Sequence, residues 1–181
     1  GHPGDGICET ASGNGICTLR AAVQESNASP GDDTIEVRPD LYQLTLSGTD
    51  EDGANTGDLD IFDSVRIVGA GATSTIIDGG KIDRVFHIIG PFNVTISGLT
   101  IRNGMTIPGE DGGAIFNSST ANTIVSRSIL ENNVADMWGG AIANDENAQI
   151  DIQESLIQGN RAGALGGGID NHRGSVTLVD S

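Results

Sequence analysis

A six-residue pattern, Gly-Gly-x-Ile-x-Asn, occurs three times in this chain at a constant interval. It reads GGAIFN from position 112, GGAIAN from position 139 and GGGIDN from position 166, so the three copies are evenly spaced. A fixed period of roughly 20 to 50 residues is typical of repeat architectures, in which each repeat is one structural unit that packs on the next. The pattern therefore predicts a stack of similar turns.

Short aliphatic strands recur with nearly the same period. Pairs of alternating inward residues begin at Val65, Val94, Thr123, Ile150 and Val176, at almost equal intervals. Two further series have similar spacing and comprise Phe86, Ile115, Ile142 and Ile169, and Ile101, Leu130 and Ile157. Three short strands per period predict an all-β fold, a parallel β-helix or solenoid. One turn cannot bury its own inner face, so successive turns would stack about 4.8 Å apart around a shared aliphatic column.

Each copy of the pattern ends in an asparagine, and these residues are Asn117, Asn144 and Asn171. The Gly-Gly pair would give each turn a corner with positive φ and close backbone approach. We expect the three amides to form a ladder, each bonded to the next, and Asn133 and Asn160 to begin a second one. The alternative interpretation of such rows is ligand binding.

Residues 1–33 lack the repeat pattern and contain both cysteines. Cys8 and Cys17 lie in a segment rich in Gly, Ser and Asn, which favours a local disulfide loop and hence an oxidising compartment and export. We expect Thr18 to be the N-cap of a short helix with an apolar stripe, which would cover the start of the stack. We therefore divide the chain into the disulfide loop and N-terminal capping helix (1–33) and the β-helix coils (34–181).

The stretches CTLRAAVQESNASPGDDTIEV (17–37), YQLTLSGTDEDGANTGDLDI (42–61) and VRIVGAGATSTIIDG (65–79) resemble a known family. It is the family of secreted bacterial β-helix proteins named for a Cys-Ser-Leu-Arg-Glu-Ala motif. Thr18 and Ala21 depart from that motif, and Ala21 removes its carboxylate. DRVFHI (83–88) and VTISGLTIRNG (94–104) extend the resemblance over nearly the whole chain. It implies a right-handed parallel β-helix with a helix over its N-terminal end, and export, but no particular activity.

The charge balance excludes two classes of partner. Nine Lys and Arg residues stand against 25 Asp and Glu residues, for a formal net charge of −16. A nucleic-acid groove or an anionic membrane surface requires clustered basic residues, and the sequence has none. No apolar run approaches the roughly 20 residues that span a bilayer, so we expect no direct membrane insertion.

The densest acidic stretch, DEDGANTGDLD, contains Asp50, Glu51, Asp52, Asp58 and Asp60. Because Ca²⁺ accepts about six to eight oxygen ligands, these side chains are candidate calcium ligands. Their spacing does not match the EF-hand loop, and a solvated acidic loop is the alternative.

Asp58 and His87 form a candidate catalytic pair. The interval between them equals that between Val65 and Val94, which we take as one turn, so they would lie side by side on an outer strand face. An acid–base site on the flank of the helix is how pectin-degrading enzymes of this fold work. The alternative is an exposed histidine that merely lies beside an aspartate.

These features predict an exported surface, adhesive or assembly module without catalysis, with a polysaccharide or other surface proteins as partners. The alternative is a polysaccharide lyase or glycoside hydrolase of the pectin-degrading β-helix type. The final segment, SVTLVDS, stops in the middle of a turn without a capping element. We therefore expect either a fragment of a longer β-helix or a subunit that associates end to end.

Overall fold

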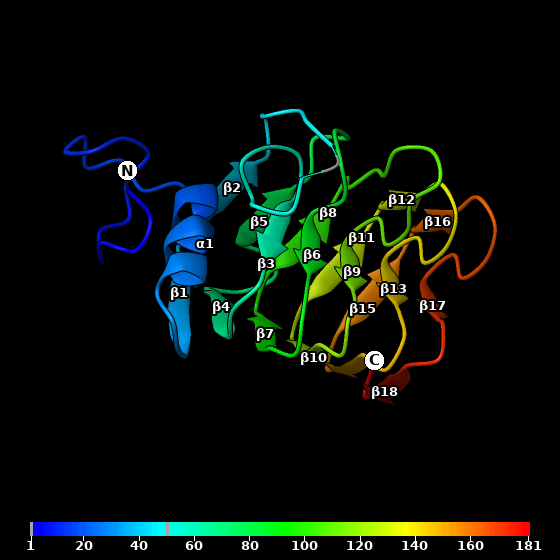
Figure 1. The fold of residues 1–181 in the computed structure, drawn as a ribbon. Helices are drawn as coiled ribbons and strands as arrows, with labels where there is room; N and C mark the ends of the chain where they lie inside the picture. Colours follow the sequence, from blue (N-terminus) through cyan, green and yellow to red (C-terminus); the bar gives the residue numbers. More distant parts are fainter. Residues whose placement is uncertain (1, 50) are drawn as a thin grey trace.

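The computed structural model describes residues 2–49 and 51–181 and folds them into a parallel β-solenoid of about four turns (Figure 1). One α-helix, α1 (Leu19–Ala28), lies beside the first strand β1 (Asp33–Val37) at the N-terminal end of the stack. All strand pairs within the described residues are parallel, and each strand pairs with its equivalent in an adjacent turn. The predicted β-helix with an N-terminal helix is confirmed.

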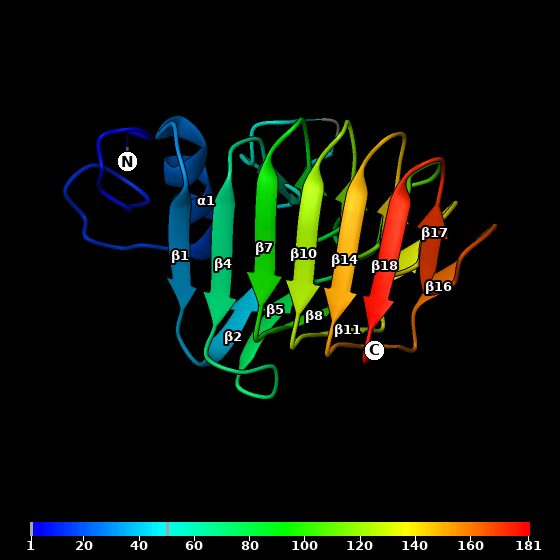
Figure 2. The same cartoon turned by 90° about the horizontal axis from the view of Figure 1, so that it is seen from below.

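Three sheets run along the stack. The first, seen face-on in Figure 2, consists of β1, β4 (Val65–Gly69), β7 (Asn93–Ser97), β10 (Asn122–Ser126), β14 (Gln149–Gln153) and β18 (Ser175–Val179). The second consists of β2 (Asp40–Gln43), β5 (Thr75–Asp78), β8 (Thr100–Arg102), β11 (Ile129–Glu131) and β15 (Leu156–Gln158). The third consists of β3 (Leu59–Ile61), β6 (Phe86–Ile88), β9 (Ile115–Asn117), β13 (Ile142–Asn144) and β17 (Ile169–Asn171). Two further strands, β12 (Val134–Ala135) and β16 (Arg161–Ala162), form a short pair. Along the sequence, each of them follows a strand of the second sheet and precedes a strand of the third.

The predicted aliphatic rows are in register. Val65, Val94, Thr123, Ile150 and Val176 occupy equivalent positions in successive strands of the first sheet. The first four of these side chains are at most 3% exposed. The other two predicted series are also in register, in the third and second sheets. Burial of these rows forms one continuous core, which is the main stabilising contribution in such a stack.

The asparagine ladder is present on the third sheet. Asn117 donates through Nδ2 to Asn144 Oδ1 at 2.7 Å, and Asn144 donates in the same way to Asn171 at 2.7 Å. Asn117 and Asn144 are buried. The second ladder is also present, because Asn133 Nδ2 donates to Asn160 Oδ1 at 3.0 Å. The structure therefore contains both predicted rows of amide hydrogen bonds.

The glycine pairs have the predicted role at the corners. Gly112, Gly139 and Gly166 have φ values of +69°, +65° and +63°, a region that L-residues rarely adopt. The second glycine of the pair serves close packing, since a Cβ on Gly140 would overlap the carbonyl oxygen of Gly167 in the next turn.

The N-terminal segment also follows the sequence prediction. The Thr18 side chain accepts a hydrogen bond from the Ala21 N–H at 3.2 Å, and so caps α1. Cys8 and Cys17 form a disulfide, with their Cα atoms 5.1 Å apart. No helix among the described residues is long and apolar enough to cross a membrane.

The strands of the last turn are edge strands. The first sheet ends at β18, where Leu178 is 56% exposed. Leu165, between β16 and β17, is 63% exposed. Such edges carry unpaired backbone groups beside apolar side chains.

Candidate functional site

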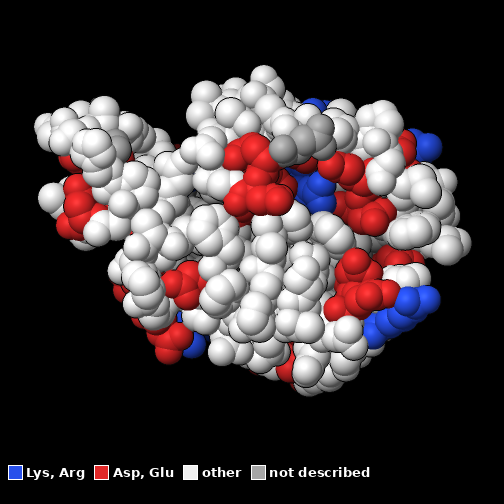
Figure 3. All heavy atoms as spheres, in the orientation of Figure 1, with Lys and Arg blue, Asp and Glu red and all other residues white. Residues whose placement is uncertain are grey.

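A cleft of about 390 Å³ lies against the outer face of the third sheet. Its lining residues are Glu51, Asp52, Asp58, Asp83, Arg84, His87, Gly109, Glu110, Asp111 and Phe116. Figure 3 shows acidic side chains gathered on this face, with a small basic patch between them. Six carboxylates against one guanidinium and one imidazole make this cleft strongly acidic.

The strand register determines which side chains face the cleft. In β6, Phe86 and Ile88 point into the core, so His87 between them points outward. The neighbouring strands place Asp60 of β3 opposite His87 on one side and Phe116 of β9 on the other. The His87 and Phe116 rings stack with their centroids 5.0 Å apart. One outward row therefore carries a carboxylate, an imidazole and a phenyl ring in successive turns.

The loop before β3 is held by Glu51. Its carboxylate accepts hydrogen bonds from the N–H groups of Gly53, Asn55 and Thr56, at 3.0, 2.6 and 2.6 Å. Burial alone would raise the pKa of Glu51, but these hydrogen bonds outweigh it and hold the pKa below its ordinary value. Glu51 is therefore committed to the shape of the loop.

Helix α1 holds the same loop from the other side through Arg20. The guanidinium donates to the carbonyl oxygens of Ala54, Thr56 and Asp58 at 3.0, 3.2 and 2.7 Å, and also to that of Gly57. A planar cation with five N–H donors suits such a cluster of backbone acceptors. The arginine of the N-terminal motif thus joins the capping helix to the edge of the cleft.

Two further side chains of α1 continue this contact. Gln24 Nε2 donates to the Ala54 carbonyl at 2.9 Å. Asn27 Nδ2 donates to the Asp60 carbonyl at 2.8 Å, and its Oδ1 accepts from the Phe62 N–H at 3.0 Å. Arg20, Gln24 and Asn27 are spaced four and three residues apart, so they lie on one face of the helix.

Arg84 lies at the centre of the cleft and is surrounded by carboxylates. Its Nε is 3.0 Å from Asp58 Oδ2, and its Nη2 pairs with Glu110. The Nε–H is not directed at a hydrogen-bond acceptor, so the Asp58 contact is an ion pair only. The guanidinium carbon also lies 5.4 Å from the centre of the Phe116 ring, a cation–π contact. Only 8% of the Arg84 side chain is exposed. Its positive charge is therefore balanced by acidic side chains of the protein rather than by solvent ions.

Asp58 has a strongly perturbed pKa. Burial raises its pKa to about 8, and the nearby charges of Asp60 and Asp83 add to the effect, outweighing Arg84. Burial also raises the pKa of Asp83, despite the hydrogen bond from the Arg84 N–H at 2.7 Å. The cluster therefore contains more carboxylates than its one arginine can balance.

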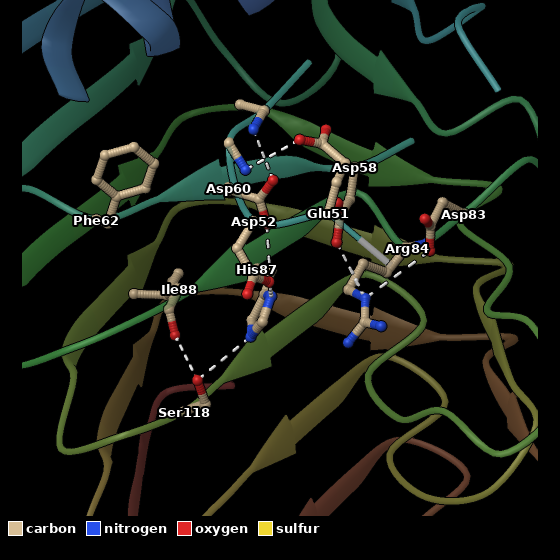
Figure 4. A network of polar contacts seen from close by, with 12 residues as sticks. Glu51, Asp52, Asp58, Asp60, Phe62, Asp83, Arg84, His87, Ile88 and Ser118 are labelled. Atoms are coloured by element: carbon tan, nitrogen blue, oxygen red, sulfur yellow. Dashed lines mark hydrogen bonds and ion pairs between the residues drawn. The ribbon is translucent and has the colours of Figure 1, made fainter. Parts of the chain in front are cut away.

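His87 has polar partners at both ring nitrogens (Figure 4). Its Nε2 lies 3.3 Å from Ser118 Oγ, and that hydroxyl donates to the Ile88 carbonyl at 3.0 Å. Its Nδ1 lies 3.5 Å from Asp60 Oδ1 and 3.7 Å from Asp52 Oδ1. Asp60 is fully buried, whereas the Asp52 side chain is 77% exposed.

The predicted pairing of Asp58 with His87 is wrong in its register. The two residues line the same cleft, but Asp60 is the residue opposite His87, and Asp58 pairs with Arg84 instead. In the first sheet one turn leads from Val65 to Val94, whereas in the third sheet one turn leads from Asp60 to His87, which is a shorter interval. The number of residues per turn at this point therefore differs between the first and third sheets, so the period of the first sheet does not predict the pairing in the third.

The four predicted calcium ligands that lie within the described residues do not form one oxygen cluster. Asp50 lies outside the described residues. Glu51 is occupied by backbone N–H groups and Asp58 by Arg84, as described above. Asp52 and Asp60 do come together, but with His87, and no other group of three potential metal ligands exists among the described residues.

No family model, curated protein or solved structure matches this chain at a significant level. The resemblance at the N-terminal motif therefore stays an expectation. Sequence reasoning missed the roles of Arg84, Glu110 and Ser118 in the site. The role of Arg20 in holding the loop was also missed, although Arg20 lies in the stretch that carries the resemblance.

Proposed function

We propose that this protein is an exported β-helix module that binds a surface glycan through the acidic cleft without cleaving it. The observation that carries the proposal is that each member of the candidate acid–base pair is engaged by other side chains. Asp58 is ion-paired to the buried Arg84, while His87 faces Asp60 and Asp52. A general acid or base must come within hydrogen-bond reach of the proton that it transfers, whereas here each candidate is engaged with another side chain. The disulfide supports export, because such bonds persist in oxidising compartments.

The charge of the cleft narrows the class of ligand. Six acidic side chains line it, and the one arginine pairs with Glu110 and also contacts Asp58. A polyuronate would bring further negative charge against these groups, so its binding is disfavoured. A neutral or amino-sugar polysaccharide meets no such repulsion, because its hydroxyl and ammonium groups donate hydrogen bonds to carboxylates.

Glycoside hydrolysis is the second candidate, favoured by the presence of several carboxylates around one cleft. Glycosidases use two carboxyl groups that flank the scissile bond. A polyuronate lyase is less favoured than a glycoside hydrolase, because the acidic side chains of the cleft would repel a polyuronate substrate.

The test combines binding and product analysis on chelator-treated protein. Retention is measured on insoluble neutral, amino-sugar and uronate polysaccharides, and the supernatants are assayed for new reducing or unsaturated ends. We expect retention on a neutral or amino-sugar polymer, none on the polyuronate, and no new ends.

Asp52→Lys is the informative variant, because Asp52 lines the cleft and its exposed side chain makes no hydrogen bond within the described residues. It should weaken retention, while Asp32→Lys, at an exposed position outside the lining, should not. Retention on none of the polymers would contradict the proposal. Release of sugar ends that Asp58→Ala abolishes would favour the hydrolase.

A further inference from the structure

One group of side chains at the cleft is not explained by the protein's own contacts. His87 Nδ1, Asp60 Oδ1 and one oxygen of Asp52 lie within 4.8 Å of one another. The two distances from Nδ1, 3.5 and 3.7 Å, exceed the roughly 2.7–2.9 Å of a charge-assisted hydrogen bond. They are close to the ~3.3 Å that separates two ligands of a tetrahedral ion with bonds of about 2.0 Å.

The hydrogen bonds of Ser118 indicate which nitrogen of the His87 ring carries the proton. Its hydroxyl donates to the Ile88 carbonyl, so its oxygen is left to accept from His87 Nε2–H. In the neutral ring this leaves the lone pair of Nδ1 directed at Asp60 and Asp52. A lone pair that faces two carboxylates is repulsive unless a cation lies between them. A hydrogen bond at the far nitrogen is also the usual means of orienting a metal-binding histidine.

Asp60 provides independent support. It is fully buried, and its Oδ2 accepts from the Ala54 N–H at 2.7 Å. Its Oδ1 has no hydrogen-bond partner among the described residues, and it is directed toward His87. A buried carboxylate oxygen without a partner costs free energy, and proteins normally pair such an atom with a donor or a cation.

The donor set selects the class of ion. Ca²⁺ and Mg²⁺ prefer oxygen ligands, whereas an imidazole nitrogen together with carboxylates suits Zn²⁺ and its neighbours among the transition metals. We infer that His87, Asp60 and Asp52 bind one divalent transition-metal ion, with Zn²⁺ as its representative. This site stands independently of the proposed glycan function. Three protein ligands leave a fourth position for water or a ligand group, and the exposed Asp52 places that position within reach of the cleft.

The test is calorimetric titration of Zn²⁺ into tag-free, chelator-treated protein near pH 7. We expect one ion per chain at this site, with Ca²⁺ a poor competitor. His87→Gln and Asp52→Asn should each lower the affinity at least about ten-fold, because each removes a ligand. The matched controls, His172→Gln and Asp32→Asn, alter exposed residues outside the cleft lining and should leave the affinity unchanged.

A second variant tests the orientation of the ring. Ser118→Ala removes the acceptor for Nε2–H without removing a ligand, and it should weaken zinc binding by roughly ten-fold. Circular dichroism checks that each variant is folded. If a variant at a buried position fails to fold, Asp52→Asn still tests the site, because the Asp52 side chain is exposed. No zinc binding, or binding that His87→Gln and Asp52→Asn leave unchanged, would overturn the inference. So would nuclear magnetic resonance evidence, in the presence of zinc, that Nδ1 carries a proton.

Discussion

Removing the central rung of the asparagine ladder should destabilise the protein more than any surface change nearby. Asn144 is 1% exposed, and its amide both accepts from Asn117 and donates toward Asn171. Its Nδ2 also lies 3.1 Å from the Ala148 carbonyl. Asn144→Ala removes all of these contacts in a place that water does not reach.

The expected magnitude follows from the groups left behind. Asn117 keeps its bond to the Gln149 carbonyl at 3.0 Å but loses the partner of its other amide hydrogen. A buried donor without a partner costs about 1–3 kcal/mol, so we expect Asn144→Ala to lower the free energy of unfolding by about 2–3 kcal/mol. For a chain of this size, about 2 kcal/mol corresponds to a fall in Tm of roughly 4–8 °C.

The assay is urea denaturation followed by circular dichroism, with thermal melts in parallel. Two matched variants give the comparison. Asp145→Ala alters the next residue, whose side chain lies outside the ladder, and should cost under about 0.5 kcal/mol. Asn171→Ala removes the last rung, which is exposed, so water replaces the lost bond and the cost should be only about 0.5–1 kcal/mol. Equal effects from Asn144→Ala and Asp145→Ala would refute the structural role of the ladder.

Four further predictions follow from other parts of the structure. Replacing both cysteines with serine should lower the free energy of unfolding by about 2–3 kcal/mol in the chain-entropy model, and mass spectrometry of exported protein should find no free thiols. Arg20→Ala leaves several loop carbonyls without a donor and should cost about 2–4 kcal/mol in urea melts, whereas the exposed Arg38→Ala should cost under about 0.5 kcal/mol. Burial tends to raise the pKa of Asp78, but hydrogen bonds from a backbone N–H, an arginine and an asparagine outweigh it and lower the pKa below 3.8. The stabilisation from ionised Asp78 is therefore present above pH 3.8 and lost as the pH falls through the lowered pKa. The free energy of unfolding, measured as the pH is lowered, should accordingly change less in Asp78→Asn than in Asp32→Asn. Sedimentation of the isolated chain should show association that increases with concentration, and Leu178→Lys on the edge strand β18 should reduce it; a monomer at all concentrations would contradict this.

The core rows could be predicted because every turn places the same kind of side chain at the same inner position. Val65 and Val94 must both be apolar, since each packs on the next turn, and the repeat of aliphatic residues records that requirement directly. The Asn117–Asn144–Asn171 ladder was predictable for the same reason, because identical amides satisfy one another.

The site was predicted only in part, because it depends on loop lengths and backbone contacts. The partner of His87 is Asp60 rather than Asp58, and a small difference in the interval between turns decides between them. Arg20 binds carbonyl oxygens, which every residue has, so its partners leave no pattern in the sequence. Glu51 was assigned to a metal although it caps its own loop, because an acidic run does not show which carboxylates face N–H groups.

We propose above that the acidic cleft binds a glycan and leaves it intact. A nuclear magnetic resonance titration of isotope-labelled protein with a soluble oligosaccharide tests both parts, because it reports the protein amides and the sugar anomeric signals in one sample. We predict saturable shifts concentrated at the cleft segment Gly109–Asp111 and around His87, with no new reducing-end signals over the course of the titration. Shifts confined to other surfaces, or the growth of new anomeric signals, would contradict the account.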